Sequence, residues 1–414
     1  MADSVAQSDV TIEARAEAGD SLSVLIAKQR HGHTLDQPFY ADPQIYRRDI
    51  ERIFLYGWLY VGHASQIPEA GDFFRFEVAE ESVIVVRDRD GEIHALVNVC
   101  RHRGSRVCWE ARGKARTFVC PYHGWAYGLD GTLRSARLMP DDFDKSQYGL
   151  RAINVEIFHG FIFISFAETP PNFDAVRRDL DARLAPFRMD RTKVAASEVY
   201  RIDANWKLAV ENFLECYHCA PAHPEFSRGH GIKLPRSQLA DLQAALEPRA
   251  EAAGLSTDTI DESPSKDRLS GPLYFYDRYP LFEGYVTGSE DGEPLAPLLG
   301  DIAEFDGGAS NLQIGPATYF LAYSDHVVVY RFTPRALQET DCEIVWLVRE
   351  DAEAGKDYDL DRLTWLWHVT TEADKAIIEH NQEGVNSRYY QPGPYAPMEH
   401  FAISYLDWYL ATIR

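Results

Sequence analysis

The chain has 414 residues, of which 45% are hydrophobic, so it is long enough to bury two separate cores. Its net charge of −22 argues against a nucleic-acid partner, because phosphate binding needs a basic surface. Six cysteines, the lack of an apolar leader after Met1 and the lack of an apolar run long enough to span a bilayer predict a reduced, cytoplasmic protein without a membrane partner.

A β-hairpin is predicted in the first quarter of the chain. Residues 83–86 form a buried-strand pattern, Asp90 and Gly91 a turn, and residues 93–99 the returning strand. That strand ends at Cys100. A second turn, at Asp130 and Gly131, follows another short apolar segment, so we expect a small antiparallel β unit with loops at its tip.

Two cysteine–histidine pairs lie in these loops. Cys100-x-His102 is followed by Cys120-x-x-His123. Two thiolates and two imidazoles in this order predict a Rieske [2Fe–2S] cluster, in which the cysteines bind one iron and the histidines the other. Such a cluster transfers one electron at a time.

A structural zinc site is the alternative, because zinc binds the same residue types. Zinc ligands more often come as Cys-x-x-Cys or His-x-x-x-His pairs, which disfavours it. Cys108 lies between the two pairs, and we interpret it as a buried thiol.

A domain junction is predicted near residues 167–171, where the apolar strand 161–166 gives way to a charged, helical segment at 173–187. The later part combines amphipathic helices with further strands, at 327–332 and 343–348. The chain has no Gly-x-Gly-x-x-Gly turn, so we do not expect it to take electrons from NADH unaided.

A second group of metal ligands is predicted between Asn205 and His223. The pattern suits a helix through Cys219 that prolines then end, so that His218 lies in its last turn and His223 just beyond. Two histidines and one carboxylate form the facial triad of non-haem Fe(II) oxygenases. Cys216 and Cys219 could instead suggest a zinc knuckle, but we interpret both as packed thiols.

The region after the histidines offers weaker signals. Residues 239–268 predict a polar helix followed by a loop, with a lid as the less favoured interpretation. Aromatic residues between 274 and 285 could enclose a methylammonium group or simply pack in strands, and packing is the more common outcome. The candidate pocket residues are Tyr276, Phe282, Phe320 and Tyr323.

The third iron ligand is predicted on a helix over residues 360–383. Asp374 lies on its apolar stripe, seven residues after Trp367 and three before Ile377. An unpaired carboxylate facing inward would be costly, and a metal ion removes that cost. The alternatives are that Asp374 pairs with a buried arginine or caps a helix break, or that Glu372 is the ligand instead.

The two ligand groups, in this order, resemble the terminal oxygenase α subunit of the Rieske non-haem iron oxygenases over most of the chain. The matching motifs are Cys-x-His, Cys-x-x-His and acid-x-x-His-x4-His. The resemblance implies an α+β fold, with a β-rich Rieske domain and a helix-grip (START-like) catalytic domain. It assigns the cluster to Cys100, His102, Cys120 and His123, the mononuclear Fe(II) to His218, His223 and Asp374, and an electron-bridging role between subunits to Glu215.

Glu215 is a departure from most aromatic-ring hydroxylases, which carry Asp there. A glutamate at this position makes the chain resemble the branch that acts on small quaternary ammonium compounds: glycine betaine monooxygenase, stachydrine demethylase and carnitine monooxygenase. Segments 204–208, 215–219, 346–348, 357–360 and 391–395 are also similar to that branch. Gly124 and the region 235–315 differ from it.

The resemblance also implies an organisation and partners. We expect an N-terminal arm (1–45) packed on the catalytic domain, a Rieske domain (46–168) and a catalytic domain (169–414). A homotrimer and a separate flavin and iron–sulfur reductase supplied by NAD(P)H are implied. The expected reaction is monooxygenation or oxidative N-demethylation of a betaine-type substrate. The alternatives are an aromatic ring-hydroxylating dioxygenase and a Rieske electron-transfer protein without an oxygenase site.

Overall fold

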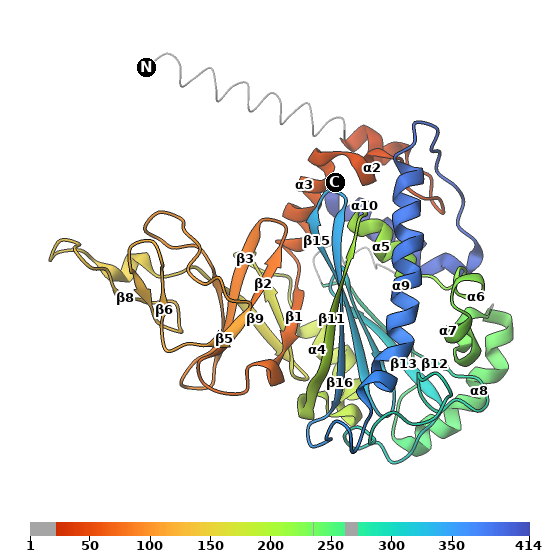
Figure 1. Ribbon diagram of the computed structural model, residues 1–414. Coiled ribbons are helices and arrows are strands. Elements are labelled where there is room, and N and C mark those ends of the chain that lie inside the picture. The colour runs from red at the N-terminus through yellow and green to blue at the C-terminus, as the bar shows by residue number, and fades with distance from the viewer. Residues whose placement is uncertain (1–21, 235, 261–271) are drawn as a thin grey trace.

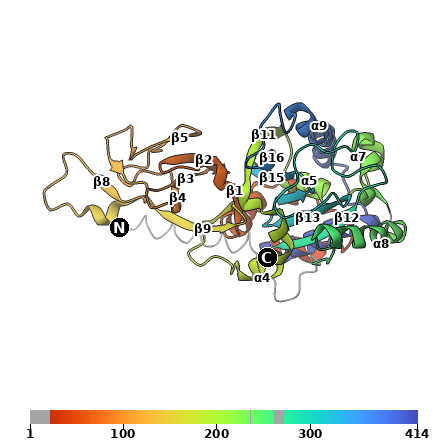
Figure 2. The ribbon, with the colours of Figure 1, turned by 90° about the horizontal axis from the view of Figure 1, so that it is seen from below.

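The computed structural model describes residues 22–234, 236–260 and 272–414 (Figure 1). The fold is α+β, as predicted, and its sheets are antiparallel. The first part of the chain forms a seven-stranded sheet, in the order β1-β10-β9-β4-β3-β2-β5, and a three-stranded sheet, β6-β7-β8. The second part forms a six-stranded sheet in the order β11-β16-β15-β14-β13-β12. Figure 2 shows the two parts side by side along the long axis of the molecule.

The strands of the first part are β1 (Leu59–His63), β2 (Asp72–Val78), β3 (Glu81–Arg87), β4 (Ile93–Val97), β5 (Arg112–Lys114), β6 (Phe118–Val119), β7 (Ala126–Tyr127), β8 (Leu133–Ser135), β9 (Ala152–Phe158) and β10 (Phe161–Ser165). Those of the second part are β11 (Thr192–Ile202), β12 (Tyr274–Pro280), β13 (Gly308–Ile314), β14 (Thr318–Ala322), β15 (Val327–Ala336) and β16 (Glu339–Arg349). The α-helices are α2 (Pro38–Ala41), α3 (Pro43–Asp49), α4 (Asp174–Leu184), α5 (Trp206–Phe213), α6 (Cys219–Ala222), α7 (Pro224–Gly229), α8 (Arg236–Ala253), α9 (Leu360–Val385) and α10 (His400–Ile413).

Most predicted elements are confirmed. The strands expected at 83–86, 161–166 and 343–348 are β3, β10 and β16, and the helix expected at 360–383 is α9. The polar helix expected from residue 239 is α8, which ends at Ala253, while residues 261–268 of that predicted segment lie outside the described part. Among the described residues, no helix is both long and apolar enough to cross a bilayer.

The six-stranded sheet is buried on both faces. One face packs against α5, α9 and α10 in a core that includes Tyr319, Trp346 and Trp367. The other face packs against α4, α8 and strands of the first part, and it carries Phe320 and Leu347. Because side chains alternate along a strand, neighbours such as Tyr319 and Phe320 belong to different cores. The long helix α9, packed on one face of this antiparallel sheet, agrees with the helix-grip expectation.

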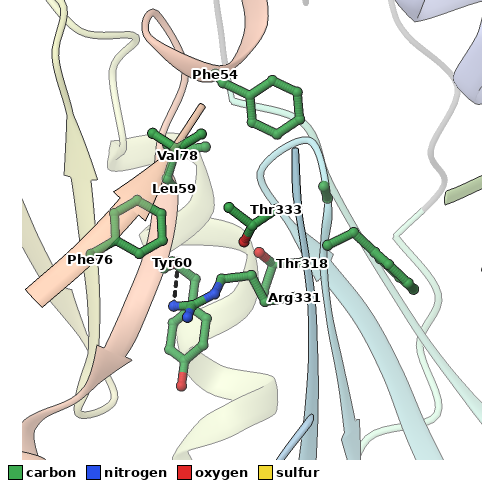
Figure 3. Close-up of a pocket in the computed structure, with 10 residues that line it drawn as sticks. Phe54, Leu59, Tyr60, Phe76, Val78, Thr318, Arg331 and Thr333 are labelled. Carbon is green, nitrogen blue, oxygen red and sulfur yellow. Dashed lines mark hydrogen bonds between the residues drawn. The ribbon is translucent and has the colours of Figure 1, made fainter. Parts of the chain in front are cut away.

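Arg331 of β15 joins the two parts of the molecule. Its guanidinium lies 4.9 Å from the ring centre of Phe76 and 5.6 Å from that of Tyr60, and it donates to the Tyr60 carbonyl at 3.3 Å (Figure 3). It also forms an ion pair with Glu343. Cation–π contacts of this kind are directional, so Arg331 helps to fix the orientation of the first sheet on the second.

The described residues before β1, from residue 22 on, pack on the second part of the chain. Asp49, at the end of α3, is fully buried and pairs with the equally buried Lys207 of α5. It also accepts hydrogen bonds from Trp206 Nε1 (3.2 Å) and from the Tyr409 hydroxyl (2.8 Å). A buried carboxylate with three donors is well compensated, and it ties α3, α5 and α10 together.

Glu211 of α5 is a second buried carboxylate, and it gives a testable pH dependence. Burial raises its pKa to about 7, although hydrogen bonds from Tyr395 and Tyr40 and the charge of Lys207 oppose the shift. Because the folded state holds this proton more tightly than the unfolded chain, the protein loses stability as the pH rises from about 4.5 to about 7. The expected loss is on the order of 3 kcal/mol.

Glu211→Gln should remove this loss, because an amide oxygen still accepts from both tyrosines and carries no charge. In urea denaturation, we expect the variant to match the wild type near pH 5 and to unfold at higher urea near pH 8. Parallel pH profiles for the two proteins would contradict the assignment.

Candidate metal centres

Two loops of the first part bring the four predicted cluster ligands together. The loop after β4 carries Cys100, whose amide donates to the Ser105 carbonyl. The loop after β6 carries Cys120, whose amide donates to the Trp125 carbonyl, and both distances are 2.8 Å. Gly104 and Gly124 have positive φ angles of 78° and 72° and donate back to the two cysteine carbonyls. The loops are thus built alike, and only glycine adopts that backbone without strain.

The donor atoms in these loops suit a mixed-ligand cluster. Cys100 and Cys120 are buried, whereas the imidazoles of His102 and His123 are exposed and their Nδ1 atoms lie 3.2 Å apart. Desolvation, followed by the neighbouring His102 and Arg103, lowers the pKa of His123, which favours the neutral imidazole that can bind a metal. Two inner sulfurs and two outer nitrogens form the donor set that a [2Fe–2S] Rieske cluster needs.

Two aromatic residues that the sequence did not single out support this site. The Tyr127 hydroxyl lies 3.2 Å from Cys100 Sγ and accepts from the Arg101 amide. The His102 ring stacks on Trp125, with ring centres 4.8 Å apart. A hydroxyl near a ligand sulfur and a ring that fixes an imidazole both orient the ligands. No sequence motif singled out Tyr127, which is buried on β7.

The second ligand group converges between α6, α7 and α9. His218 precedes α6 and His223 lies between α6 and α7. Asp374 Oδ1, on α9, lies 3.2 Å from His218 Nε2 and 2.8 Å from His223 Nε2. These are the only described His, Cys, Asp or Glu residues that form such a metal-sized group, with all ligand atoms within 4.8 Å.

The electrostatics at this site favour a cation. Burial by itself would raise the pKa of Asp374, but hydrogen bonds from the two histidines lower it, so the carboxylate is ionised. Burial opposes protonation of His218, yet Asp374 and Glu215 outweigh it and raise its pKa to about 9. The ionised carboxylate and the two imidazoles thus form a donor set that suits a divalent metal ion.

Glu215 orients His218. Its Oε1 lies 2.6 Å from His218 Nδ1, on the side of the ring opposite the triad. An imidazole that donates from Nδ1 to a carboxylate leaves Nε2 free to bind metal, as second-shell partners commonly arrange. Glu225 lies farther from the other ligand, with Oε1 3.8 Å from His223 Nδ1.

The predicted helix through Cys219 was wrong. Helix α5 ends at Phe213, and a turn at 214–218 separates it from the short α6. The reason lies in Glu215, whose side chain accepts hydrogen bonds from the amides of Tyr217 and His218 and so replaces helical bonds. The turn lets His218 face His223, with ring centres 5.2 Å apart.

The prediction of two packed thiols at Cys216 and Cys219 was also wrong, because the structure joins them in a disulfide. The disulfide closes the turn that carries His218. Cys100, Cys108, Cys120 and Cys342 are free and buried, which for Cys108 agrees with the prediction.

Two of the four predicted pocket residues lie on the wrong face of the sheet. Tyr276 and Phe320 belong to the core against α4 and the first part, and Phe320 packs on Tyr60 at 5.6 Å. Both are separated by the sheet from the core that contains Trp367, so we do not retain them as pocket residues. The rival ligand Glu372 is exposed. Ile377 is also exposed, at 37%, so its predicted placement on the apolar stripe was wrong.

Tyr323 and Phe282 lie on the other side, near α7. The Tyr323 hydroxyl lies 2.7 Å from His230 Nε2, and the Phe282 amide donates to the Gly229 carbonyl at 2.8 Å. His230 itself was missed, although it follows His223 by seven residues. Two of the predicted pocket residues thus lie beside α7, on the same side of the sheet as the triad.

Five buried aromatic residues pack together beside α7 and α9, the helices next to His223 and Asp374, and we call them the aromatic wall: Phe226, His230, Tyr323, Tyr330 and Trp367. His230 stacks on Phe226 with ring centres 3.9 Å apart, and Trp367 lies 5.7 Å from Phe226 and 5.6 Å from Tyr330. The Tyr330 hydroxyl bonds Thr371 Oγ1 at 2.7 Å, one helical turn before Asp374. Burial lowers the pKa of His230 to about 4, so this wall is electrically neutral.

Comparisons with known proteins match both parts of the molecule. The profile described as "Rieske [2Fe-2S] domain" matches residues 57–150, and "Ring hydroxylating alpha subunit (catalytic domain)" matches residues 189–414. The chain belongs to the Rieske ring-hydroxylating oxygenase α subunits. It is a Rieske-type non-haem iron oxygenase that uses a [2Fe–2S] cluster and mononuclear iron and needs a reductase. The catalytic domain overturns the alternative of a plain electron-transfer protein.

Several relatives share most of the chain. The oxygenase subunit of glycine betaine monooxygenase from Chromohalobacter salexigens is 38% identical over 408 residues, covering 96% of this chain and 90% of the relative. The oxygenase subunit of carnitine monooxygenase from Acinetobacter pittii is 36% identical over 367 residues, 86% of each chain. Among solved structures, the quaternary ammonium Rieske monooxygenase CntA in complex with an inhibitor has a TM-score of 0.71 at 23% identity, over 94% of this chain and 97% of that one. At 23% identity, the similarity to CntA shows a shared fold alone.

Proposed function

We propose that this oxygenase oxidises an N-methyl group of a small quaternary ammonium compound of the betaine type. The observation that carries the proposal is the neutral aromatic wall beside the triad, because aromatic faces attract a methylammonium cation without needing a counter-charge. The full-length similarity to the glycine betaine and carnitine oxygenase subunits supports the same substrate class.

The proposed ligands follow the geometry of the two sites. Cys100, His102, Cys120 and His123 would hold the cluster, and His218, His223 and Asp374 the mononuclear iron. When bound, the cluster supplies single electrons and the iron supplies the site of dioxygen activation. Glu215 holds the proton on His218 Nδ1 and so keeps Nε2 directed at the triad.

The arrangement of the two sites supports a homo-oligomer, which we propose to be a trimer. The cluster loops next to β6 and the triad between α6 and α9 lie at opposite ends of the molecule (Figures 1 and 2). Electron transfer weakens steeply with distance, so the useful route is from the cluster of one subunit to the iron of the next. Glu215, on the outer side of His218, would meet His123 of the neighbouring copy.

The domain limits are part of the proposal: an arm at 1–45, a Rieske domain at 46–168 and a catalytic domain at 169–414. The strands that form the first two sheets all lie between Leu59 and Ser165, and those of the third sheet between Thr192 and Arg349, which supports these limits. We propose that the protein acts in the cytoplasm, with electrons from NAD(P)H delivered by a flavin and iron–sulfur reductase.

The reaction inserts one oxygen atom into a methyl C–H bond and reduces the second to water, using two electrons and two protons. The resulting carbinolamine releases formaldehyde and leaves the demethylated amine. The aromatic wall binds the cation and excludes water from its methyl groups. An arene dioxygenase is the second candidate, with support from shorter or more distant matches. The α subunit of biphenyl 2,3-dioxygenase from Rhodococcus jostii is 40% identical over 199 residues, 44% of this chain, and naphthalene 1,2-dioxygenase from Rhodococcus sp. shares the fold with a TM-score of 0.67 at 22% identity.

The wall predicts a specific effect of Trp367→Leu. We expect KM for a quaternary ammonium substrate to rise about tenfold, since a cation–π contact in a dry site contributes about 1–2 kcal/mol. Trp367→Phe, which keeps an aromatic face, should restore most of the affinity. An equal loss in both variants would indicate a packing role only.

The function is tested by incubating the enzyme, a compatible reductase and NADH with glycine betaine, carnitine, stachydrine and benzoate in separate reactions. We expect formaldehyde and the demethylated amine, in equal amounts, from at least one quaternary ammonium compound. A diol or phenol from benzoate, with no formaldehyde from the others, would overturn the proposal.

A further inference from the structure

A groove of about 370 Å³ opens on the Rieske domain beside the cluster ligand Cys120. Its floor is made of buried residues, among them Phe73, Val107, Cys108 and Phe118, which belong to the same core cluster as Cys100 and Cys120. Val119 and Pro121, the chain neighbours of Cys120, line the groove as well. A molecule seated there would lie against the packed shell that surrounds the cluster sulfurs.

The rim of the groove is aromatic and mainly basic, with one carboxylate, Glu110. Trp109 is 65% exposed and Val119 is 53% exposed, and both line it. Arg112 and Lys114 of β5 line it too, and Arg116 is exposed between the lining residues Ala115 and Thr117. Lys114 pairs with Glu69 and Asp72, whereas Arg112 and Arg116 form no ion pair with the described residues. Exposed tryptophan and unpaired arginine are the residue types that protein interfaces favour.

The charge of this region is opposite to that of the chain. Between Cys100 and Arg137 there are eight arginines and lysines and two carboxylates, while the whole chain has 42 basic and 64 acidic residues. A basic segment on an otherwise acidic protein attracts an acidic partner to one part of its surface and repels it elsewhere.

The groove is separate from the imidazole side of the cluster. His102, His123, Tyr122 and Trp125 do not line it. The imidazole side is the one that, in the proposed trimer, meets Glu215 of the next subunit. Electrons would therefore leave the cluster through its histidine ligands, towards the iron of the next subunit. The groove offers a separate site on the cysteine side, where an electron donor could reach the cluster.

We propose that this groove, which we call the basic groove (Trp109, Arg112, Arg116, Val119 and the floor beneath them), is the docking site for an acidic iron–sulfur electron donor. The inference rests on the proposed function and adds where the donor binds. The unpaired arginines attract the acidic face of the donor, and Trp109 provides the apolar anchor. One electron passes from the reduced donor cluster to the oxidised Rieske cluster, and no bond forms or breaks.

The probe is a reduced plant-type [2Fe–2S] ferredoxin, which is acidic, mixed with the oxidised holoenzyme in a stopped-flow instrument while the visible Rieske absorbance bleaches. In Arg112→Glu/Arg116→Glu, we expect the second-order rate to fall at least about tenfold at low salt and the difference to shrink at high salt. Trp109→Ala should slow the reaction at every salt concentration. Binding of oxidised ferredoxin, measured by calorimetry, should weaken in parallel.

The control is Arg388→Glu, since Arg388 is exposed on the catalytic domain and forms no ion pair with the described residues. It should behave as the wild type, and dithionite should reduce all variants equally. Unchanged ferredoxin rates in the double variant, an equal fall in Arg388→Glu, or a wild-type cluster that ferredoxin cannot reduce would overturn the docking site. A changed oligomeric state in the double variant would also overturn it and assign the groove to a second copy of the chain. If dithionite reduced no cluster in the wild-type protein, the proposed function itself would be contradicted, and not only the docking site.

Discussion

Glu215→Gln is expected to lower steady-state turnover about 100-fold or more while both metal centres stay assembled. In the structure Glu215 touches no triad oxygen; it accepts from His218 Nδ1 at 2.6 Å. A glutamine oxygen can still accept that proton, so iron binding survives. The negative charge that we propose to couple the two imidazoles across the subunit boundary is lost. Iron content and the visible cluster spectrum should therefore match the wild type, and only the rate should change.

The decisive readout for this variant is reoxidation of the pre-reduced Rieske cluster in the presence of substrate and dioxygen. We expect it to slow as much as turnover does. Glu225→Gln is the matched control, because Glu225 is also a carboxylate beside a triad histidine, but its oxygen is 3.8 Å away. Wild-type reoxidation in Glu215→Gln, or an equal defect in Glu225→Gln, would refute the bridging role.

Asp374→Ala is expected to abolish mononuclear iron binding and all oxygenase activity. Asp374 Oδ1 is the one described carboxylate oxygen within reach of both histidine Nε2 atoms, at 3.2 and 2.8 Å. Removing it leaves two imidazoles and no charge to balance Fe(II). The Rieske domain lies at the far end of the molecule, so its visible spectrum should persist.

Glu372→Ala provides the control for Asp374→Ala, because Glu372 is a carboxylate on the same helix that faces solvent. It should retain iron, measured by metal analysis after removal of loosely bound metal. If Asp374→Ala kept one iron per chain beyond the cluster, the third ligand would have to be another residue.

The parts of the site that the sequence predicted well depend on short spacing or on a long regular element. The cysteine–histidine pairs each lie within one tight loop, so their spacing nearly defines the geometry. Asp374 could be placed because α9 is a long helix with a regular apolar stripe, and only Ile377, near the triad, departs from it.

The predictions that were wrong concern features that depend on tertiary contacts and not on the local sequence. Tyr276 and Phe320 were placed on the wrong face because both faces of the six-stranded sheet are buried, so the strands show no apolar–polar alternation. The helix predicted through Cys219 ends early because a Glu215 side chain competes for backbone amides, an effect that helix propensity does not capture. The disulfide and His230 likewise depend on contacts formed only by folding.

The central claim, that a quaternary ammonium compound binds beside iron at the aromatic wall, is tested most directly without a reductase. Nitric oxide would be bound to the Fe(II) site with the Rieske cluster oxidised, and the paramagnetic resonance spectrum recorded while betaines, carnitine analogues and aromatic acids are added in turn. We predict a sharpened or shifted signal with a quaternary ammonium compound, and a weaker response in Trp367→Leu. A response to aromatic acids alone would contradict the account and favour ring hydroxylation.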